Sequence, residues 1–171
     1  MEKTKESRYQ DSLAELSKFY DKYNNKANKL TYISKLTSIC AILHKNLPDF
    51  HFVGFYLVTN LLDSNSNLLE EKALEIGPYQ SPILATPRIK FGIGVCGTCW
   101  KEKKTIIEND VTICKNYIAC DGATLSEIVV PVWNVDKTEV IAVLDIDGQS
   151  KGLYDEIDQK YLEEIVSLIH K

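Results

Sequence analysis

The sequence contains no apolar run that could cross a membrane. Although 44% of its 171 residues are hydrophobic, no stretch approaches the roughly 18 consecutive apolar residues that a membrane-spanning helix needs. The first twelve residues, MEKTKESRYQDS, are polar and lack the apolar segment of a secretory signal. We therefore expect a cytoplasmic protein with no membrane partner.

Concentrated positive charge is also missing. The net charge is −4, and the most basic stretch, Lys101 to Lys104, is interrupted by Glu102. Nucleic-acid-binding proteins usually gather Lys and Arg on one face, so nucleic acid is not an expected partner. Internal repeats and low-complexity segments are absent as well, and the length suits one domain with its own hydrophobic core.

The spacing of apolar residues predicts both helices and strands. Three- and four-residue steps predict amphipathic helices over 9–23 and 30–47. After Pro48 the period changes, and residues 51–58 and 71–76 predict two strands, the second ending at Gly77 and Pro78. Further on we predict a short helix over 95–103, strands over 105–107, 126–132 and 140–147, and a closing helix with Asp155 as its N-cap. This order predicts an α+β fold with a mostly antiparallel sheet, in a single domain over 1–171 whose N-terminal helices occupy 1–47 and whose sheet and loops occupy 50–171.

Five cysteines are present, and four of them lie between residues 96 and 120. Without a secretory signal, cysteines are usually free thiols, redox groups or metal ligands. Cys40 falls in the apolar stripe of the second helix and is interpreted as a core residue. Cys96 begins a predicted helix, where backbone NH groups stabilise a thiolate, although a buried and inert Cys96 is the alternative.

The Cys96-Gly-Thr-Cys99 motif leaves two hypotheses open. It could be a dithiol redox pair, or it could form a four-thiolate zinc site with Cys114 and Cys120. Zinc ribbons usually pair two CxxC knuckles, and the wider separation of Cys114 and Cys120 therefore argues against zinc. We expect no bound metal and no cofactor.

Carboxylates follow the last of these cysteines. Asp121 is adjacent to Cys120, and Glu127 leads into an apolar strand. Asp145 and Asp147 flank Ile146, and the two-residue period of a strand places both carboxylates on one face. Like charges buried together raise the pKa of at least one of them, which leaves a proton donor near neutral pH.

Several of these stretches resemble one enzyme family. The segments VGFY, GPYQ, GIGVCGT, IACDGATLSEIVVP and AVLDID are similar to those of the free methionine-(R)-sulfoxide reductases, a branch of the GAF-domain fold. The resemblance runs from about Phe52 to the last helix. It implies a six-stranded, mostly antiparallel sheet flanked by helices, often in a homodimer. It also implies reduction of free L-methionine-(R)-sulfoxide, with thioredoxin as the partner that recharges the enzyme.

The resemblance also implies roles for individual residues. Cys120 would attack the sulfoxide sulfur and become a sulfenic acid, and Cys96 would then form a disulfide with it. Glu127 suits the acid that protonates the departing oxygen. The expected substrate-binding residues are Asp121, Asp145, Asp147, Tyr56 and Phe52.

Three positions depart from the pattern of the family. Thr86 stands in place of a further loop cysteine, Phe52 in place of a tryptophan and Tyr117 in place of a histidine. With Thr86 in the loop, Cys96 is the expected resolving thiol and Cys99 is an alternative. The departures keep a second hypothesis open, a non-catalytic GAF-type module that binds a small ligand or senses redox state.

Overall fold

A computed structural model describes residues 3–23, 29–118 and 122–171 of the chain. The helices are α1 (Lys5–Tyr23), α2 (Tyr32–Asn46), α3 (Gly94–Glu102) and α4 (Glu156–Ser167), with 3-10 turns η1 (Val111–Ile113) and η2 (Leu168–His170). The strands are β1 (Phe50–Leu62), β2 (Leu68–Gln80), β3 (Arg88–Ile89), β4 (Ile106–Glu108), β5 (Ser126–Trp133) and β6 (Val140–Gly148). In the described ranges no helix combines the length and the apolarity needed to span a bilayer.

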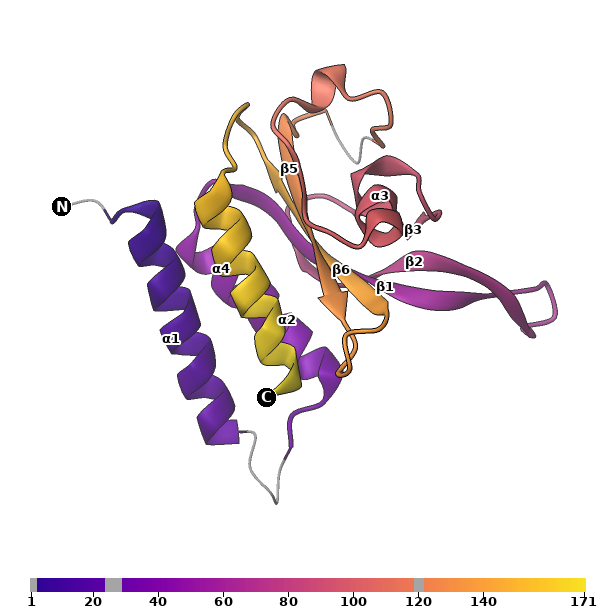
Figure 1. Cartoon of the computed structure of the whole chain (residues 1–171), viewed down its shortest axis with the longest axis horizontal. Coiled ribbons are helices and arrows are strands. Elements are labelled where there is room, and N and C mark those ends of the chain that lie inside the picture. The colour runs from indigo at the N-terminus through magenta and orange to yellow at the C-terminus, as the bar shows by residue number, and fades with distance from the viewer. Residues whose placement is uncertain (1–2, 24–28, 119–121) are drawn as a thin grey trace.

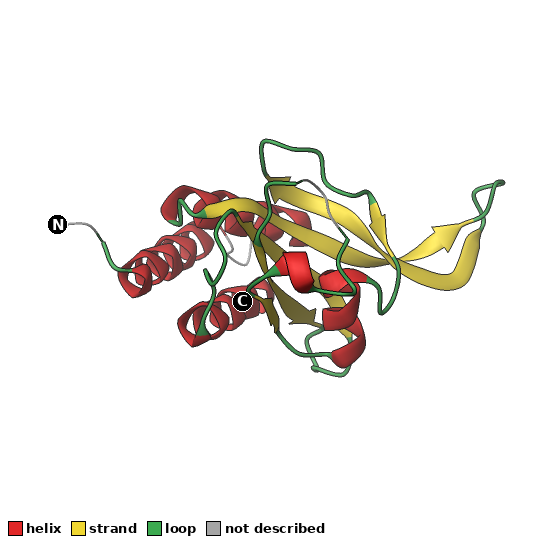
Figure 2. Ribbon diagram, turned by 90° about the horizontal axis from the view of Figure 1, so that it is seen from above, coloured by secondary structure: helices red, strands yellow, loops and turns green. Residues whose placement is uncertain are grey.

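The six strands form one antiparallel sheet in the order β3-β2-β1-β6-β5-β4. The predicted α+β class and six-stranded sheet are confirmed. Helices α1, α2 and α4 lie on one face of the sheet, and α3 lies on the other (Figure 1). Seen from above, the β1–β2 hairpin extends beyond the rest of the molecule (Figure 2).

Two separate hydrophobic clusters follow from this arrangement. Side chains alternate across a strand, so neighbouring residues of β5 and β6 face opposite sides of the sheet. Ile128 and Ile146 belong to the cluster under α1, α2 and α4. Val129 and Val143 belong to the cluster under α3, together with Cys96 and Cys99. The larger cluster holds the helices on the sheet, and the smaller one supports the loops around α3.

Strand β2 is longer than the sequence predicts. It does not end at Gly77 and Pro78 but continues to Gln80. The register between β1 and β2 shifts between Gly54 and Tyr56, so that the proline lies at an irregularity where it interrupts no regular ladder. Nearby, the fully buried Cys40 thiol donates to the Pro78 carbonyl, with 3.3 Å between the atoms. Cys40 is a core residue, as predicted.

A capping box formed by Asp155 and Asp158 fixes the start of α4. The predicted N-cap is confirmed, because the Asp155 side chain accepts hydrogen bonds from the backbone NH groups of Ile157 and Asp158. The buried Asp158 carboxylate also accepts from the Tyr9 hydroxyl at 2.7 Å and the Lys5 ammonium at 2.6 Å. These bonds connect α1 to α4 on the helical side of the sheet.

Candidate functional site

Strand register gathers three carboxylates on the α3 side of the sheet. Glu127 of β5 lies directly opposite Asp147 of β6, and Asp145 lies opposite Val129, two residues further along β5. All three side chains are buried, with exposed fractions of 4 to 6%. The placement of Asp145 and Asp147 on one face follows from the strand period, as predicted.

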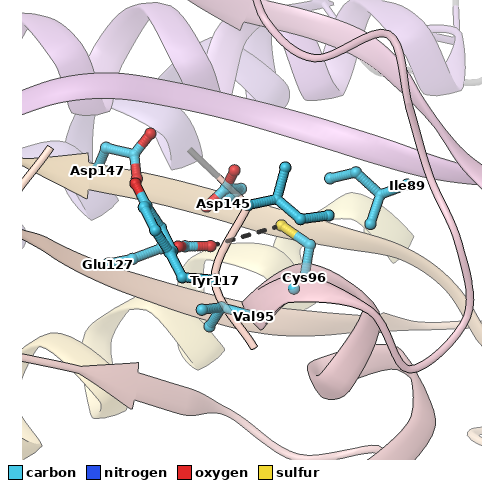
Figure 3. Close-up of a pocket in the computed structure, with 9 residues that line it drawn as sticks. Ile89, Val95, Cys96, Tyr117, Glu127, Asp145 and Asp147 are labelled. Carbon is cyan, nitrogen blue, oxygen red and sulfur yellow. Dashed lines mark hydrogen bonds between the residues drawn. The ribbon is translucent and has the colours of Figure 1, made fainter. Parts of the chain in front are cut away.

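Helix α3 brings a thiol to these carboxylates. Cys96 is 2% exposed, and its Sγ donates to Glu127 Oε1 across 3.8 Å. Figure 3 shows the Cys96 sulfur pointing toward the Glu127 and Asp145 carboxylates, with Asp147 further along the same strand. The sequence separation of Cys96 and Glu127 is large, and only the packing of α3 on β5 and β6 brings them together.

Glycines allow this close packing of α3. A Cβ atom at Gly97 would lie 2.4 Å from the Lys90 carbonyl oxygen, which no real side chain tolerates. Gly94 has a φ of +69°, and the Ile118 side chain lies against it. The glycines of GIGVCGT therefore let α3 place Cys96 on the sheet. They also leave space for the Ile118 side chain beside Gly94.

Cys96 and the three carboxylates line a small and strongly acidic pocket. Its walls are Ile89, Gly94, Val95, Cys96, Tyr117, Ile118, Glu127, Asp145 and Asp147. None of these described lining residues is a lysine, arginine or histidine, so no lining side chain neutralises the carboxylates. The cavity has a volume of about 10 Å³, close to that of one water molecule. Any larger ligand requires movement of the walls.

Burial changes the proton affinity of the site. Desolvation raises the pKa of Asp145 from 3.8 to about 6, against the lowering effect of hydrogen bonds from Cys96 and Glu127. The prediction that at least one clustered acid has a raised pKa is therefore confirmed. Asp145 carries a proton part of the time just below neutral pH and can donate it.

The predicted thiolate at Cys96 is wrong for this arrangement. Burial raises the pKa of the Cys96 thiol well above its usual value, and the neighbouring charges of Asp145 and Glu127 raise it further. Burial likewise raises the pKa of Cys99, which is 0% exposed. The favourable field at the start of a helix does not compensate for desolvation beside two carboxylates. Cys96 is therefore a neutral thiol at neutral pH.

A pH-dependent stability follows from the raised pKa of Asp145. The folded chain binds the proton of the Asp145 carboxyl more tightly than the unfolded chain does. Protonated Asp145 therefore stabilises the fold fully below about pH 4, and this stabilisation is lost as the pH rises through about 6. We expect Asp145→Asn to raise the free energy of unfolding at pH 7.5 by on the order of 2 kcal/mol, with a smaller gain at pH 4. Urea unfolding at both pH values measures this, with Glu70→Gln on the exposed part of β2 as the control. An equal effect at the two pH values would contradict it.

The remaining predicted site residues fall into two groups. Phe52 and Tyr56 are buried in the cluster under α3, where Phe52 stacks on Tyr79, but neither lines the pocket. Cys120 and Asp121 lie outside the described residues. The sequence identified Tyr117 only as a departure from the family pattern, and it gave no signal for the lining roles of Ile89, Val95 or Ile118.

The four-thiolate zinc hypothesis gains no support from the described cysteines. Within the described part of the chain, the group that could hold a metal ion is Cys96, Glu127 and Asp145, and it includes neither Cys99 nor Cys114. Cys99 packs in the core, and Cys114 is partly buried at the edge of the same cluster. Cys96 and Cys99 lie three residues apart, about one helical turn, so both pack from the same face of α3 into the cluster beneath it. This packing explains the CxxC spacing without a zinc knuckle.

Comparisons with known proteins agree with this architecture. The sequence model of the GAF domain matches residues 36–170. GAF domain-containing protein A of Dictyostelium discoideum is 36% identical over 97% of this chain and 92% of its own length. Free methionine-R-sulfoxide reductase of Escherichia coli is 34% identical over 91% of this chain and 88% of its own length. The chain belongs to the free methionine-R-sulfoxide reductase branch of the GAF-domain family.

A solved structure supports this placement in the reductase branch. The free methionine-R-sulfoxide reductase of Neisseria meningitidis, in complex with its substrate, superposes with a TM-score of 0.80 at 31% identity, over 99% of this chain and 90% of that one. The family resemblance predicted from the sequence is confirmed. In this member of the reductase family, the acidic pocket between α3 and the strands β5 and β6 is the candidate active site.

Proposed function

We propose that the protein reduces free L-methionine-(R)-sulfoxide to methionine by thiol chemistry. The observation that carries the proposal is the acidic pocket, in which a thiol and three carboxylates meet without a neutralising lining cation. Relatives named for this activity, and a structural neighbour in complex with its substrate, support the same chemistry. The reaction is an oxidoreduction at sulfur.

The carboxylates suit the free amino acid. Methionine sulfoxide that is not part of a peptide carries an α-ammonium group, and a buried anionic pocket favours a cation that can hydrogen-bond to it. Asp145 and Asp147 are the proposed receptors from the described residues, and Asp121 is proposed from the sequence. A methionine sulfoxide residue within a peptide lacks this ammonium and gains nothing from the carboxylates.

Cys120 is the proposed nucleophile. Its thiolate attacks the sulfoxide sulfur, an S–S bond forms, and the S–O bond breaks as the oxygen is protonated and leaves as water. Water then attacks the Cys120 sulfur and breaks the S–S bond, so that methionine leaves and Cys120 becomes a sulfenic acid. Glu127 protonates the oxygen as the S–O bond breaks, and Asp145 beside it holds a further proton. Ile118, two residues before Cys120 in the sequence, lines the pocket.

Cys96 is the proposed resolving thiol. Because burial keeps it protonated, it does not compete with Cys120 for the sulfoxide. Once Glu127 has given up its proton, its carboxylate accepts the Cys96 thiol proton along the existing contact. The Cys96 sulfur then displaces hydroxide from the Cys120 sulfenic acid, which forms a disulfide and releases water. Thioredoxin reduces the disulfide, and this cycle suits the reducing cytoplasm.

Substrate entry requires the pocket to open. Its volume of about 10 Å³ cannot hold methionine sulfoxide. Tyr117 and Ile118 are the lining residues from the segment before Cys120, and Figure 3 shows the Tyr117 side chain beside Glu127 and Asp147. We propose that these two side chains move away when the substrate binds.

One assay distinguishes this enzyme from a non-catalytic ligand-binding module. The purified protein is given the R and S sulfoxides of methionine, each free and within a peptide, with thioredoxin and its reductase as electron source. We expect methionine only from the free R sulfoxide. Binding of the sulfoxide without any methionine, even with dithiothreitol as reductant, would instead identify a module that senses its ligand, the hypothesis that Thr86 keeps open.

A further inference from the structure

The thiol and two of the carboxylates are arranged as a set of metal ligands. One ligand atom each from Cys96, Glu127 and Asp145 lies within 4.8 Å of the other two, and all three residues are buried. The set contains one sulfur and two oxygens, drawn from α3, β5 and β6. Cys96 is the one residue that this set shares with the four-thiolate zinc site considered from the cysteine spacing.

A second observation points to a cation in this set. Asp145 is 4% exposed, and its Oδ1 atom is buried with no hydrogen-bond partner among the described residues. An unpaired carboxylate oxygen in the interior is costly unless a proton, a hydrogen-bond donor or a cation meets it. No described lining side chain is a lysine, arginine or histidine, and the cavity volume of about 10 Å³ has room for one small ion.

We propose that Cys96, Glu127 and Asp145 bind one thiophilic divalent cation, with Zn²⁺ as the best match. Bond lengths of about 2.3 Å to sulfur and 2.0 Å to oxygen place the sulfur and oxygen ligands of a tetrahedral Zn²⁺ about 3.5 Å apart. Cys96 Sγ and Glu127 Oε1 are 3.8 Å apart, so a small movement completes this pair. Mg²⁺ and Ca²⁺ prefer oxygen ligands throughout and are disfavoured by the thiolate.

Binding is a proton exchange without electron transfer. The Cys96 thiol loses its proton to solvent as the sulfur–zinc bond forms, and any proton on Asp145 leaves in the same way. Three protein ligands leave a fourth tetrahedral position for water. The ion would occupy the space that the substrate ammonium needs and would hold the resolving thiol. Zn²⁺ and methionine sulfoxide therefore exclude each other, and Zn²⁺ inhibits the protein reversibly.

The test measures metal binding without turnover. Cys120→Ser protein is titrated with Zn²⁺ against a chromophoric chelator, and with Co²⁺ while the absorption spectrum is recorded. We expect one equivalent of metal, proton release, and a sulfur-to-cobalt charge-transfer band. Cys96→Ser should lose the charge-transfer band. Cys96→Ser and Asp145→Asn should each lower the affinity for Zn²⁺ at least about 10-fold. The matched control, Cys40→Ser, removes a buried thiol on the opposite face of the sheet and should bind as before.

The outcomes separate cleanly. A Co²⁺ complex without the thiolate band, less than a tenth of an equivalent of Zn²⁺, or unchanged affinity in Cys96→Ser would each overturn the proposal. Asp145→Asn is expected to be more stable than the parent at neutral pH, so weak binding by this variant cannot be ascribed to unfolding. Because the readout is binding by a variant without the proposed nucleophile, a failure of the reductase proposal leaves this result unaffected.

Discussion

Cys120→Ser is expected to lower the reduction of free methionine-(R)-sulfoxide by about 1000-fold or more. A serine hydroxyl stays protonated at neutral pH and is a far weaker nucleophile than a thiolate, so the first attack on sulfur fails. Methionine formation with dithiothreitol as the reductant measures this directly. Dithiothreitol is used because it removes any dependence on thioredoxin docking.

Two further cysteine variants complete the experiment. Cys40→Ala removes a buried thiol on the far side of the sheet and should keep its activity. Cys96→Ser should produce one methionine per protein and then cycle slowly with thioredoxin. A Cys120→Ser variant as active as the parent would refute the nucleophile, and loss of the first turnover in Cys96→Ser would place Cys96 in the chemical step.

Glu127→Gln is expected to lower kcat by about 100- to 10,000-fold, the range over which a positioned acid contributes. Glutamine keeps the size of the side chain but cannot deliver a proton to the sulfoxide oxygen or accept one from Cys96. Single-turnover and steady-state rates at pH 6 and pH 8 measure the loss.

Glu108→Gln is the matched control for Glu127→Gln. Glu108 lies directly opposite Glu127 on the neighbouring strand β4, but it does not line the acidic pocket. The same chemical change at this position should therefore leave kcat near that of the parent. If both variants retain full activity, the proton comes from Asp145 or from solvent, and the assignment of Glu127 is wrong.

The features that sequence predicts well are those encoded by local periodicity. The β-branched runs of the β5 and β6 segments predict two strands. The two-residue repeat of a strand then puts Asp145 and Asp147 on one face. The Asp155 cap is equally local, since its partners are two and three residues away. Burial of Cys40 follows from its place in a helical stripe.

Other features depend on contacts between distant segments, and they could not be predicted from the sequence. The neutral state of Cys96 requires α3 to pack its first turn on two carboxylates, whereas the sequence shows only a cysteine at a helix start. Ile118 lines the pocket because Gly94 leaves it room. The continuation of β2 through Pro78 depends on a register shift in its partner strand. Each of these is decided by a neighbour remote in the chain.

The sheet divides the hydrophobic interior into two clusters, and the two faces of the sheet therefore have different roles. The cluster beneath α1, α2 and α4 contains most of the large buried side chains, and we expect it to contribute most of the hydrophobic stabilisation of the fold. The smaller cluster beneath α3 supports the loops around the pocket, and we expect their local opening to cost less free energy than global unfolding. Substitutions can thus accumulate around α3 and alter chemistry while the helical side maintains the scaffold.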